Sequence, residues 1–550
     1  MLMLVWLTVQ TWTTTFAPKP VTAAASNTGA PDGTAATPAT AAPLAPPSLP
    51  ALPGTSPSAA TAALTTLADV APAVAAPSTR IQVRTDVLDL VIDTVGGNIV
   101  ATLLPAYPVH KDEPDVPVEL LSTKPERLFV LQGGLRAADG QPEANHLATF
   151  TSPTTSFTLA PGASELKVPL TWTSPTGIVV TKTYTLRPGG YEIDLDYTVQ
   201  NNSALPYETA EYLQMQRLFT PPNQSMFDVE TYSFNGPVAY DGNKYSKLDV
   251  EDLPTTPFTQ TVVQGWFGAI QHHFLAAAIP PAAESWIYNG SFADGKFLVS
   301  AIGPRQSIAP ASSAQFSAKL FIGPKLQDQL EATAPGLELT VDYGRLTLLA
   351  QPMFWLLDNV HNLVHNWGLT IILVTLLIKL VFYKLSETSG RSMAGMRKLQ
   401  PRMKALQERY KDDRQAMSTA LMELYKKEKI NPAAGCLPML VQIPFFIAFY
   451  WVLLESVEMR QAPFALWITD LSSKDPFFIL PLLMGAAMFF QQKLNPPPPD
   501  PVQAKMMQIM PIVFTGFFAF FPAGLVLYWL TNSVLSIAQQ WRINKVLGAD

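Results

Sequence analysis

The residue with the clearest chemical potential is a lysine, Lys379, which lies inside an apolar stretch from Trp367 to Leu385. A charged side chain at the centre of a membrane helix costs at least roughly 2.5 to 3.5 kcal/mol on insertion scales, so it is usually kept for a function. Thr375 precedes it by four residues and therefore shares its helical face. A lysine facing a watery cavity would attract acidic groups entering the membrane. A simpler interpretation is that Lys379 extends to the headgroups near Lys384.

Two further polar side chains lie within apolar stretches, Gln442 in LVQIP and Asn532 in LYWLTNS. Each could line the same cavity as Lys379. Each could equally hydrogen-bond a neighbouring helix and so hold the helices together. The residues by themselves leave both interpretations open.

The residue types that most enzymes use form no recognisable constellation. His361 and His365 have a spacing that could hold a metal on one helical face, but no glutamate motif accompanies them, so we expect no metal site. The single cysteine, Cys436, permits no intramolecular disulfide and is expected to pack rather than react. The chain also lacks a phosphate-binding loop and a nucleophile elbow. We therefore predict neither an enzyme nor a bound cofactor.

The composition favours a membrane protein with a soluble part. The 550 residues are 48% hydrophobic and 15% charged, and the mean hydropathy is +0.16. The net charge of -6 argues against direct binding of nucleic acid, because such domains usually carry a basic excess.

The N-terminal region contains a short apolar segment and a long tether. Residues 1–16 are interpreted as a transmembrane anchor, although the segment is short for a span of about 20 residues. A cleaved signal peptide that ends at the small residues near Ala23 is the alternative. Residues 17–78 are almost entirely Ala, Pro, Thr, Ser and Gly, a composition that predicts a disordered linker.

Residues 79–342 alternate polar and apolar positions around glycine-rich turns such as Gly96-Gly97 and Pro188-Gly189-Gly190. Alternation with a period of two predicts antiparallel strands, here enough for a large β-sandwich. Residues 343–366 follow as an amphipathic helix that could lie in the membrane interface, with Trp367 as its anchor. The apolar stripe of this helix consists of Met353, Leu356, Leu357, Val360, Leu363 and Val364.

Residues 367–385 are predicted to form the second transmembrane helix, and residues 386–430 a cytoplasmic helical hairpin. Between Lys384 and Lys429 twelve basic residues stand against six acidic ones, an excess typical of cytoplasmic loops. Apolar residues recur there at helical spacing on both sides of Asp412-Asp413, where we place the hinge. Pro401 is expected to break the first helix of the hairpin.

Residues 431–550 contain four more apolar segments, interpreted as transmembrane helices 3–6, and a short C-terminal tail. The segments are 437–454, 477–490, 506–521 and 524–538. Alternating sides from the cytoplasmic hairpin places the C-terminus in the cytoplasm. With the N-terminal anchor, the chain is predicted to be polytopic and α-helical, with six spans.

Long sequence blocks, among them MRKLQPRMKALQERYKDD, LYKKEKINPAAGCLPMLVQIPFF and FFPAGLVLYWLTN, resemble the YidC family of membrane protein insertases. RTDVLDLVIDTVGGNIVATLLPAYP resembles the large periplasmic domain of its Gram-negative branch. The resemblance implies a five-helix core that encloses a hydrophilic groove open to the cytoplasm and to lipid. It also implies a location in the bacterial inner membrane.

The resemblance assigns roles to particular residues. Lys379 occupies the place of the arginine that is typical of the family's groove. Thr375, Tyr528 and Trp529 match its substrate-contacting positions, and we include Gln442 and Asn532 in the substrate groove. Arginine stays charged almost anywhere, whereas lysine depends more on its surroundings, so this groove must stay wet if the charge is essential.

The implied partners are nascent membrane proteins, the lipid bilayer, secretion channel subunits, and ribosomes or targeting factors that bind the hairpin. A small-solute transporter would also explain a buried cation, but it predicts internal repeats, which the chain does not show. A membrane-anchored sugar-modifying enzyme is suggested only by analogy, because many β-sandwich domains bind sugars. No paired carboxylates in the sequence support this alternative.

Overall fold

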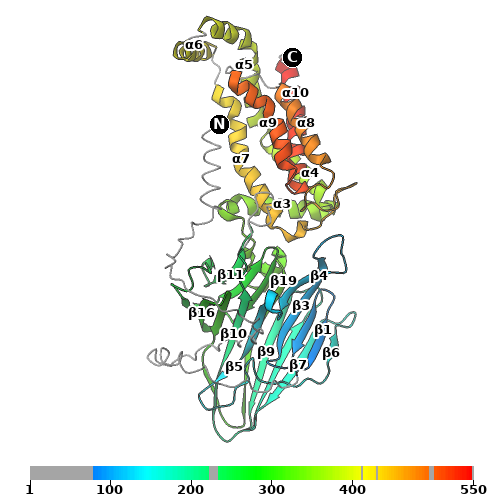
Figure 1. Cartoon of the computed structure of the whole chain (residues 1–550), viewed down its shortest axis with the longest axis vertical. Coiled ribbons are helices and arrows are strands. Elements are labelled where there is room, and N and C mark those ends of the chain that lie inside the picture. The colour runs from blue at the N-terminus through cyan, green and yellow to red at the C-terminus, as the bar shows by residue number, and fades with distance from the viewer. Residues whose placement is uncertain (1–77, 222–232, 411–412, 429–431, 495–500, 548–550) are drawn as a thin grey trace, which may run out of the picture.

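The computed structural model describes residues 78–221, 233–410, 413–428, 432–494 and 501–547. It divides into a β-sandwich at one end of the long axis and a group of helices at the other (Figure 1). The predicted anchor, 1–16, lies outside the described residues, as does the predicted linker, 17–78, apart from its last residue.

The sandwich consists of an eleven-stranded and an eight-stranded sheet. The first sheet has the order β13 (Phe258–Val263), β16 (Ser285–Ala293), β17 (Lys296–Ile302), β10 (Tyr207–Leu218), β5 (Phe129–Ala137), β4 (Pro117–Ser122), β3 (Asn98–Pro108), β2 (Asp89–Asp93), β1 (Arg80–Arg84) and β6 (Ser156–Thr158), with β18 (Gln306–Ile308) beside β10. The second has the order β12 (Tyr245–Lys247), β11 (Asn235–Tyr240), β14 (Trp266–Gln271), β15 (Phe274–Ile279), β19 (Ser312–Pro324), β9 (Glu192–Asn201), β8 (Ile178–Leu186) and β7 (Leu166–Thr173). The prediction of a large antiparallel sandwich is confirmed, and among the described strands only β1 and β6 pair in parallel.

Sequence alternation sets the core of the sandwich. β1 buries Ile81 and Val83 and exposes Arg80, Gln82 and Arg84, as a strand covered on one face must. The turn before β3 needs glycine, because Gly96 has a φ of 75° and a Cβ there would lie 2.3 Å from the carbonyl oxygen of His146.

A fully buried lysine joins the two sheets. Lys182 of β8 donates hydrogen bonds from Nζ to Asn98 Oδ1 (2.7 Å) and to the carbonyl oxygens of Gly96 (3.1 Å) and Gly133 (3.0 Å). Burial lowers the pKa of this lysine well below its usual value. Its three acceptors offset the cost of burying the polar group, so Lys182 specifies how the sheets align.

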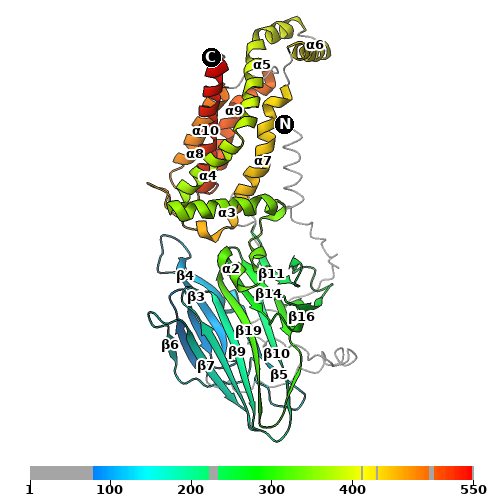
Figure 2. The same ribbon diagram turned by 180° about the vertical axis from the view of Figure 1, so that it is seen from behind.

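Short helices lead from the sandwich to the helical region. They are α2 (Gln327–Thr333), η4 (Leu337–Thr340) and η5 (Gly344–Leu346), followed by α3 (Thr347–Val364). α3 lies crosswise between the sandwich and the remaining helices (Figure 2). It buries Met353 and Leu357, whereas Leu363 of the predicted apolar stripe is 81% exposed. α3 thus carries apolar residues on two faces, one of them packed in the protein.

The helical region contains α4 (Trp367–Val381), α5 (Tyr383–Arg409), α6 (Arg414–Lys427), α7 (Pro432–Glu455), α8 (Ile479–Leu494), α9 (Pro501–Phe518) and α10 (Ala523–Leu547). α10 packs against α4 and α8, and α7 packs against α3 and α5. Asn366 caps the start of α4 by accepting a hydrogen bond from the amide of Leu369.

Two sequence-based expectations about these helices are corrected. The predicted helix 367–385 ends at Val381, and the chain bends by 64° into α5. At the bend, Phe382 packs edge-on against Phe445 of α7, which fixes the change of direction. Pro401 does not break α5, because Leu399 and Met403 on either side of it pack against Leu421 of α6 and so offset the local cost of proline.

By length and hydropathy, none of the described helices qualifies alone as a membrane span, and only α4 together with residues 383–392 of α5 qualifies as a bent pair. The number of spans therefore stays a prediction.

Candidate functional site

Lys379 lies near the end of α4 and reaches across to α10. Its Nζ donates a hydrogen bond to Ser536 Oγ at 2.7 Å. The Ser536 hydroxyl donates in turn to the carbonyl oxygen of Asn532, also at 2.7 Å. None of the ion pairs among the described residues involves Lys379. A neutral hydroxyl is thus the hydrogen-bond partner of this lysine in the described structure.

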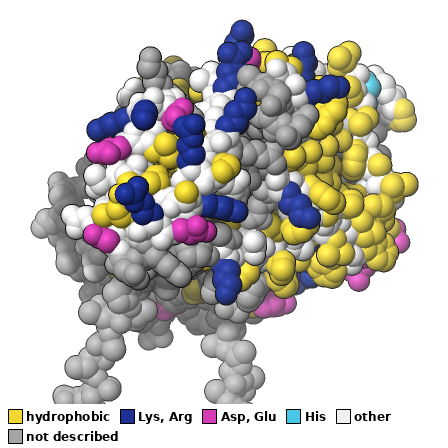
Figure 3. Space-filling view, turned by 90° about the horizontal axis from the view of Figure 1, so that it is seen from above, with side chains coloured by type: hydrophobic (Ala, Val, Ile, Leu, Met, Phe, Trp, Pro, Cys, Tyr) yellow, Lys and Arg dark blue, Asp and Glu magenta, His cyan; other side chains and the backbone are white. Residues whose placement is uncertain are grey.

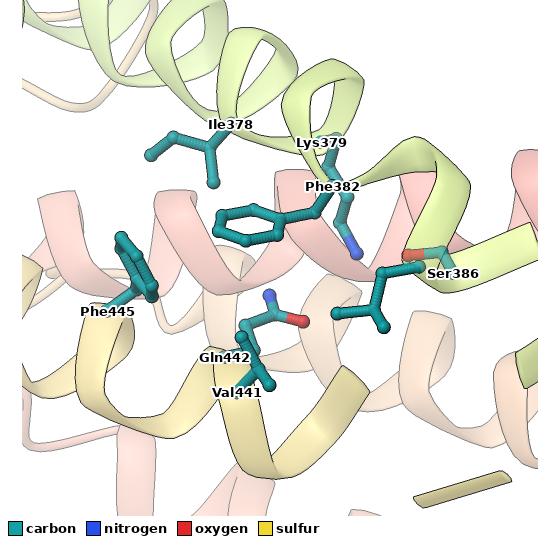
Figure 4. A pocket seen from close by; sticks show the side chains of 8 residues that line it. Ile378, Lys379, Phe382, Ser386, Val441, Gln442 and Phe445 are labelled. Carbon is teal, nitrogen blue, oxygen red and sulfur yellow. The ribbon is translucent and has the colours of Figure 1, made fainter. Parts of the chain in front are cut away.

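Lys379 lines a small cavity between α4, the start of α5, and α7 (Figure 4). Its walls are Ile378, Lys379, Phe382, Leu385, Ser386, Val441, Gln442 and Phe445. The cavity measures about 20 Å³, which is room for one or two water molecules and far less than a peptide segment needs.

Gln442 both lines this cavity and joins two helices. Its Nε2 donates to Asn532 Oδ1 of α10 at 2.6 Å. The side chains of Gln442 and Tyr528 also form a hydrogen bond. The two interpretations that the sequence left open for Gln442 therefore describe one arrangement, in which a cavity residue also holds α7 to α10.

The remaining predicted site residues lie away from the cavity wall. Thr375 is buried, and its hydroxyl donates to the carbonyl oxygen of Ile371 at 2.6 Å. Tyr528 is buried and stacks on Phe449 with ring centroids 4.3 Å apart. Trp529 meets Phe446 edge-on at 4.7 Å. Tyr528 and Trp529 thus belong to an aromatic cluster that binds α10 to α7.

The structure brings Lys379, Gln442, Asn532 and Tyr528 into one network and adds Ser536, which sequence reasoning missed. A signal was available, because Tyr528, Asn532 and Ser536 follow one another at intervals of four residues and so share one face of α10. We call Lys379, Gln442, Tyr528, Asn532 and Ser536 the polar network.

The two histidines considered for a metal have other contacts. His361 stacks face to face on Trp367, with centroids 3.9 Å apart, and this contact buries the predicted interface anchor. His365 lies edge-on to His361 at 6.4 Å. Within the described residues, no group of three metal-ligating side chains comes together. Cys436 lies in a segment of α7 whose side chains are outside the described residues.

The fold and the site together define a class of protein: a large antiparallel sandwich joined through a crosswise helix to an apolar helical region with a polar centre. Comparison with protein families makes this specific. Residues 80–356 match the family model described as the YidC periplasmic domain, and residues 359–549 match the 60Kd inner membrane protein model. The chain belongs to the YidC family.

Two relatives at 50% identity or more agree with this assignment. The chain is 53% identical over 489 residues to the membrane protein insertase YidC of Thioalkalivibrio sulfidiphilus, covering 86% of this chain and 87% of that one. It is 50% identical over 478 residues to the insertase YidC of Nitrosococcus oceani, covering 87% of each. A crystal structure of an active YidC insertase with its first transmembrane domain resolved aligns with 84% of this chain and 92% of that chain, at 18% identity and a TM-score of 0.38.

Proposed function

We propose that this chain is a membrane protein insertase of the bacterial inner membrane, and that its polar network receives the polar end of the incoming protein. Its relatives are named membrane protein insertases. The observation that carries the site assignment is the position of Lys379, whose ammonium lies on a cavity wall and is bonded to a neutral hydroxyl.

Electrostatics explains how the site would act. An acidic group entering the cavity would replace the Ser536 hydroxyl as the partner of Lys379, because a charge-assisted hydrogen bond is roughly twice as strong as a neutral one. The membrane potential would help to move an acidic tail outward, at about 2.3 kcal/mol per charge per 100 mV. Lys379 would thus lower the barrier to bringing a polar tail into the membrane.

The hydrophobic effect would supply the remaining driving force. α4 presents Leu373, Leu376, Leu377 and Leu380 on its exterior, where they are 37 to 59% exposed. An apolar segment leaving the cavity along this face would enter lipid, and burial of its surface contributes roughly 25 cal/mol per Å². The proposed path runs from the polar network to the exposed face of α4.

Separation of α7 from α10 would open the path. The Gln442–Asn532 hydrogen bond and the stacking of Tyr528 on Phe449 hold the two helices together in the described state. An entering polar tail could exchange hydrogen bonds with Gln442 and Asn532, so the cost of parting the helices would be partly offset.

The proposed orientation has the sandwich in the periplasm and the α5–α6 hairpin and C-terminus in the cytoplasm, with six spans in all. The view from the helical end shows Lys and Arg side chains over that end, beside a broad apolar area (Figure 3). This end would face ribosomes or targeting factors, while secretion channel subunits would be lateral partners. α3 would lie in the periplasmic interface, where its exposed Trp355 and Leu363 would meet lipid.

Photocrosslinking tests the proposed site. A crosslinking amino acid at Val441, on the cavity wall, should capture a nascent single-span protein during insertion. The same group at Leu205, exposed on the sandwich, should not. Equal capture at both positions, or none at Val441 while insertion proceeds, would overturn the proposal.

A further inference from the structure

The sandwich contacts the C-terminal end of α7 through a buried polar cluster. The cluster comprises His272, His273 and Lys325 of the sandwich, and Leu454 and Glu455 of α7; we call it the α7 clamp. α7 reaches the sandwich at this end (Figures 1 and 2). α7 also packs against η5, α3, α5 and α10. At the clamp, the sandwich contacts a helix that lines the cavity of the helical region.

The two histidines form the loop of the β14–β15 hairpin. Gln271 pairs with Phe274, so His272 and His273 are the whole connection. His272 has a φ of 50°, at a loop position that favours glycine. The imidazole of His272 lies against α7, within hydrogen-bond distance of its Leu454 carbonyl oxygen.

Both imidazoles converge on one carbonyl group. The rings stack with centroids 3.6 Å apart, and their Nε2 atoms lie 3.3 Å (His272) and 3.0 Å (His273) from the carbonyl oxygen of Leu454. A carbonyl oxygen only accepts, so each imidazole donates from Nε2. Leu454 is among the last four residues of α7, whose carbonyl groups have no partner within the helix. The histidines therefore cap α7.

An ion pair completes the clamp. Lys325 Nζ lies 3.2 Å from Glu455 Oε2, and the two side chains are 1% and 6% exposed. Lys325 also donates from its backbone amide to the carbonyl oxygen of His273 at 2.8 Å, so the pair and the histidines form one unit. A buried ion pair adds little to stability, because burying two charges costs about as much as their attraction returns. Removal of one partner is strongly destabilising, since it leaves the other charge buried without a counter-charge. Such a pair can also specify the geometry of a contact.

The loop after α7 is held by the start of α2 and by the end of β3 with the loop that follows it. Glu458 accepts from the backbone amide of Gln327 at 3.3 Å. Arg460 donates to the carbonyl oxygen of Pro108 at 2.9 Å, and Lys111 donates to that of Gln461 at 3.1 Å. The contact is thus continuous from the last turn of α7 into the loop.

We propose that the sandwich positions α7, and that His272, His273 and Lys325 are positioning residues for Gln442. Gln442 lies twelve residues before Leu454 on the same helix, about 18 Å along its axis. Fixing one end of the helix fixes the height and rotation of Gln442 against Asn532. The predicted effect on insertion rests on the proposed function, whereas the positioning of α7 does not.

Spin-label distances test the positioning directly. Spin labels are placed at Ile447 of α7 and Val534 of α10 in full-length protein with Cys436→Ala. They report the distance between the two helices and its distribution. Lys325→Met should broaden this distance distribution and lower insertion about tenfold, since small misplacements are costly. Adding Glu455→Leu should restore most of the narrow distance distribution and most of the insertion rate, because the buried carboxylate that Lys325→Met leaves unpaired is then absent. Lys124→Met, which removes an exposed ion pair with Glu119, is the matched control and should change neither.

A second variant covers the case in which Lys325→Met fails to fold. His272→Gly suits the backbone of the hairpin and removes one cap, so the sandwich should fold while the distance distribution still broadens. An unchanged distribution in both folded variants would overturn the positioning role, whatever insertion does. Altered distances with normal insertion would show that the clamp positions α7. They would overturn the proposal that this positioning of Gln442 matters for insertion.

Discussion

Lys379 of α4 and Ser536 of α10 are joined by a 2.7 Å hydrogen bond in which the lysine donates and the hydroxyl accepts. Ser536 can accept from Lys379 because its own proton is donated to the carbonyl oxygen of Asn532. The orientation of the hydroxyl is therefore set by α10 itself, and it offers a lone pair to the ammonium.

Ser536→Ala should reduce insertion of a reporter with an acidic tail more than one with a neutral tail. The substitution removes the acceptor of the half-buried ammonium of Lys379, at a cost of about 1–3 kcal/mol, so Lys379 would leave its place on the cavity wall. The measurement is the ratio of the two insertion rates. Ser536→Thr retains the hydroxyl and should keep the wild-type ratio, and an unchanged ratio in Ser536→Ala would show that the bond is dispensable.

Asn532→Leu should destabilise the helical region by about 1–3 kcal/mol, because the Nε2 of Gln442 then loses its acceptor on α10. Thermal unfolding in detergent measures this loss. The double variant Gln442→Leu with Asn532→Leu should recover part of it, since neither member of the Gln442–Asn532 pair then leaves the other unpaired. If the double variant loses as much as the sum of the single variants, the two residues are not coupled.

The α7 clamp should weaken in acid. Burial lowers the pKa of His272 to about 4 and that of His273 well below its usual value. The unfolded chain therefore binds these protons more readily, so the contribution of the histidines is complete above about pH 6.5 and is lost as the pH falls toward about 4. Glu455, Lys325 and Arg460 are the charged groups whose fields act on His272.

Glu458 opposes this trend, because burial raises its pKa to about 7. Its contribution is present at low pH and is lost as the pH rises through about 7. The melting temperature should therefore be compared between wild type and a His272→Gln, His273→Gln variant, which keeps hydrogen-bond donors but does not titrate there. The wild type should lose stability relative to the variant between pH 7 and pH 5, the range chosen for the assay, and parallel curves would contradict the assignment.

Lys182→Met should destabilise the sandwich by on the order of 3 kcal/mol, because Asn98 Oδ1 and the carbonyl groups of Gly96 and Gly133 lose a buried donor. Lys167→Met, on the exterior of the same sheet, removes an exposed ion pair with Glu165 and should have little effect. Chemical denaturation of the full chain followed by tryptophan fluorescence compares the two variants. An equal loss of stability in the two variants would mean that the hydrogen bonds of Lys182 do not hold the two sheets together.

Local pattern predicted the large antiparallel sandwich and the helical character of the C-terminal region. The alternation that buries Ile81 and Val83 in β1 belongs to the pleat of a strand, and the turn at Gly96-Gly97 requires glycine. Helical spacing likewise placed Leu399 and Met403 on one face of α5, but not the packing of that face against Leu421, which offsets the local cost of Pro401. These features depend on neighbours in the sequence, so the sequence displays them.

Contacts between distant elements could not be predicted in this way. Ser536 and Lys379 are separated by 157 positions, and Lys325 and Glu455 by 130, so no periodicity relates them. Thr375 illustrates a different limit. Its position on the face of Lys379 was evident, but a helical threonine can donate to its own backbone four residues earlier, and this one does.

The charge of Lys379 is the centre of the proposed mechanism, and charge reversal tests it most directly. Cells depleted of their own insertase would express wild type, Lys379→Arg, Lys379→Glu or, as a nearby control, Lys384→Glu, and the insertion rate of an acidic-tailed single-span reporter would be measured. The mechanism predicts wild-type rates for Lys379→Arg and Lys384→Glu. It also predicts a loss of at least about tenfold for Lys379→Glu, which corresponds to about 1.4 kcal/mol. Wild-type insertion by a folded, membrane-resident Lys379→Glu variant would contradict it.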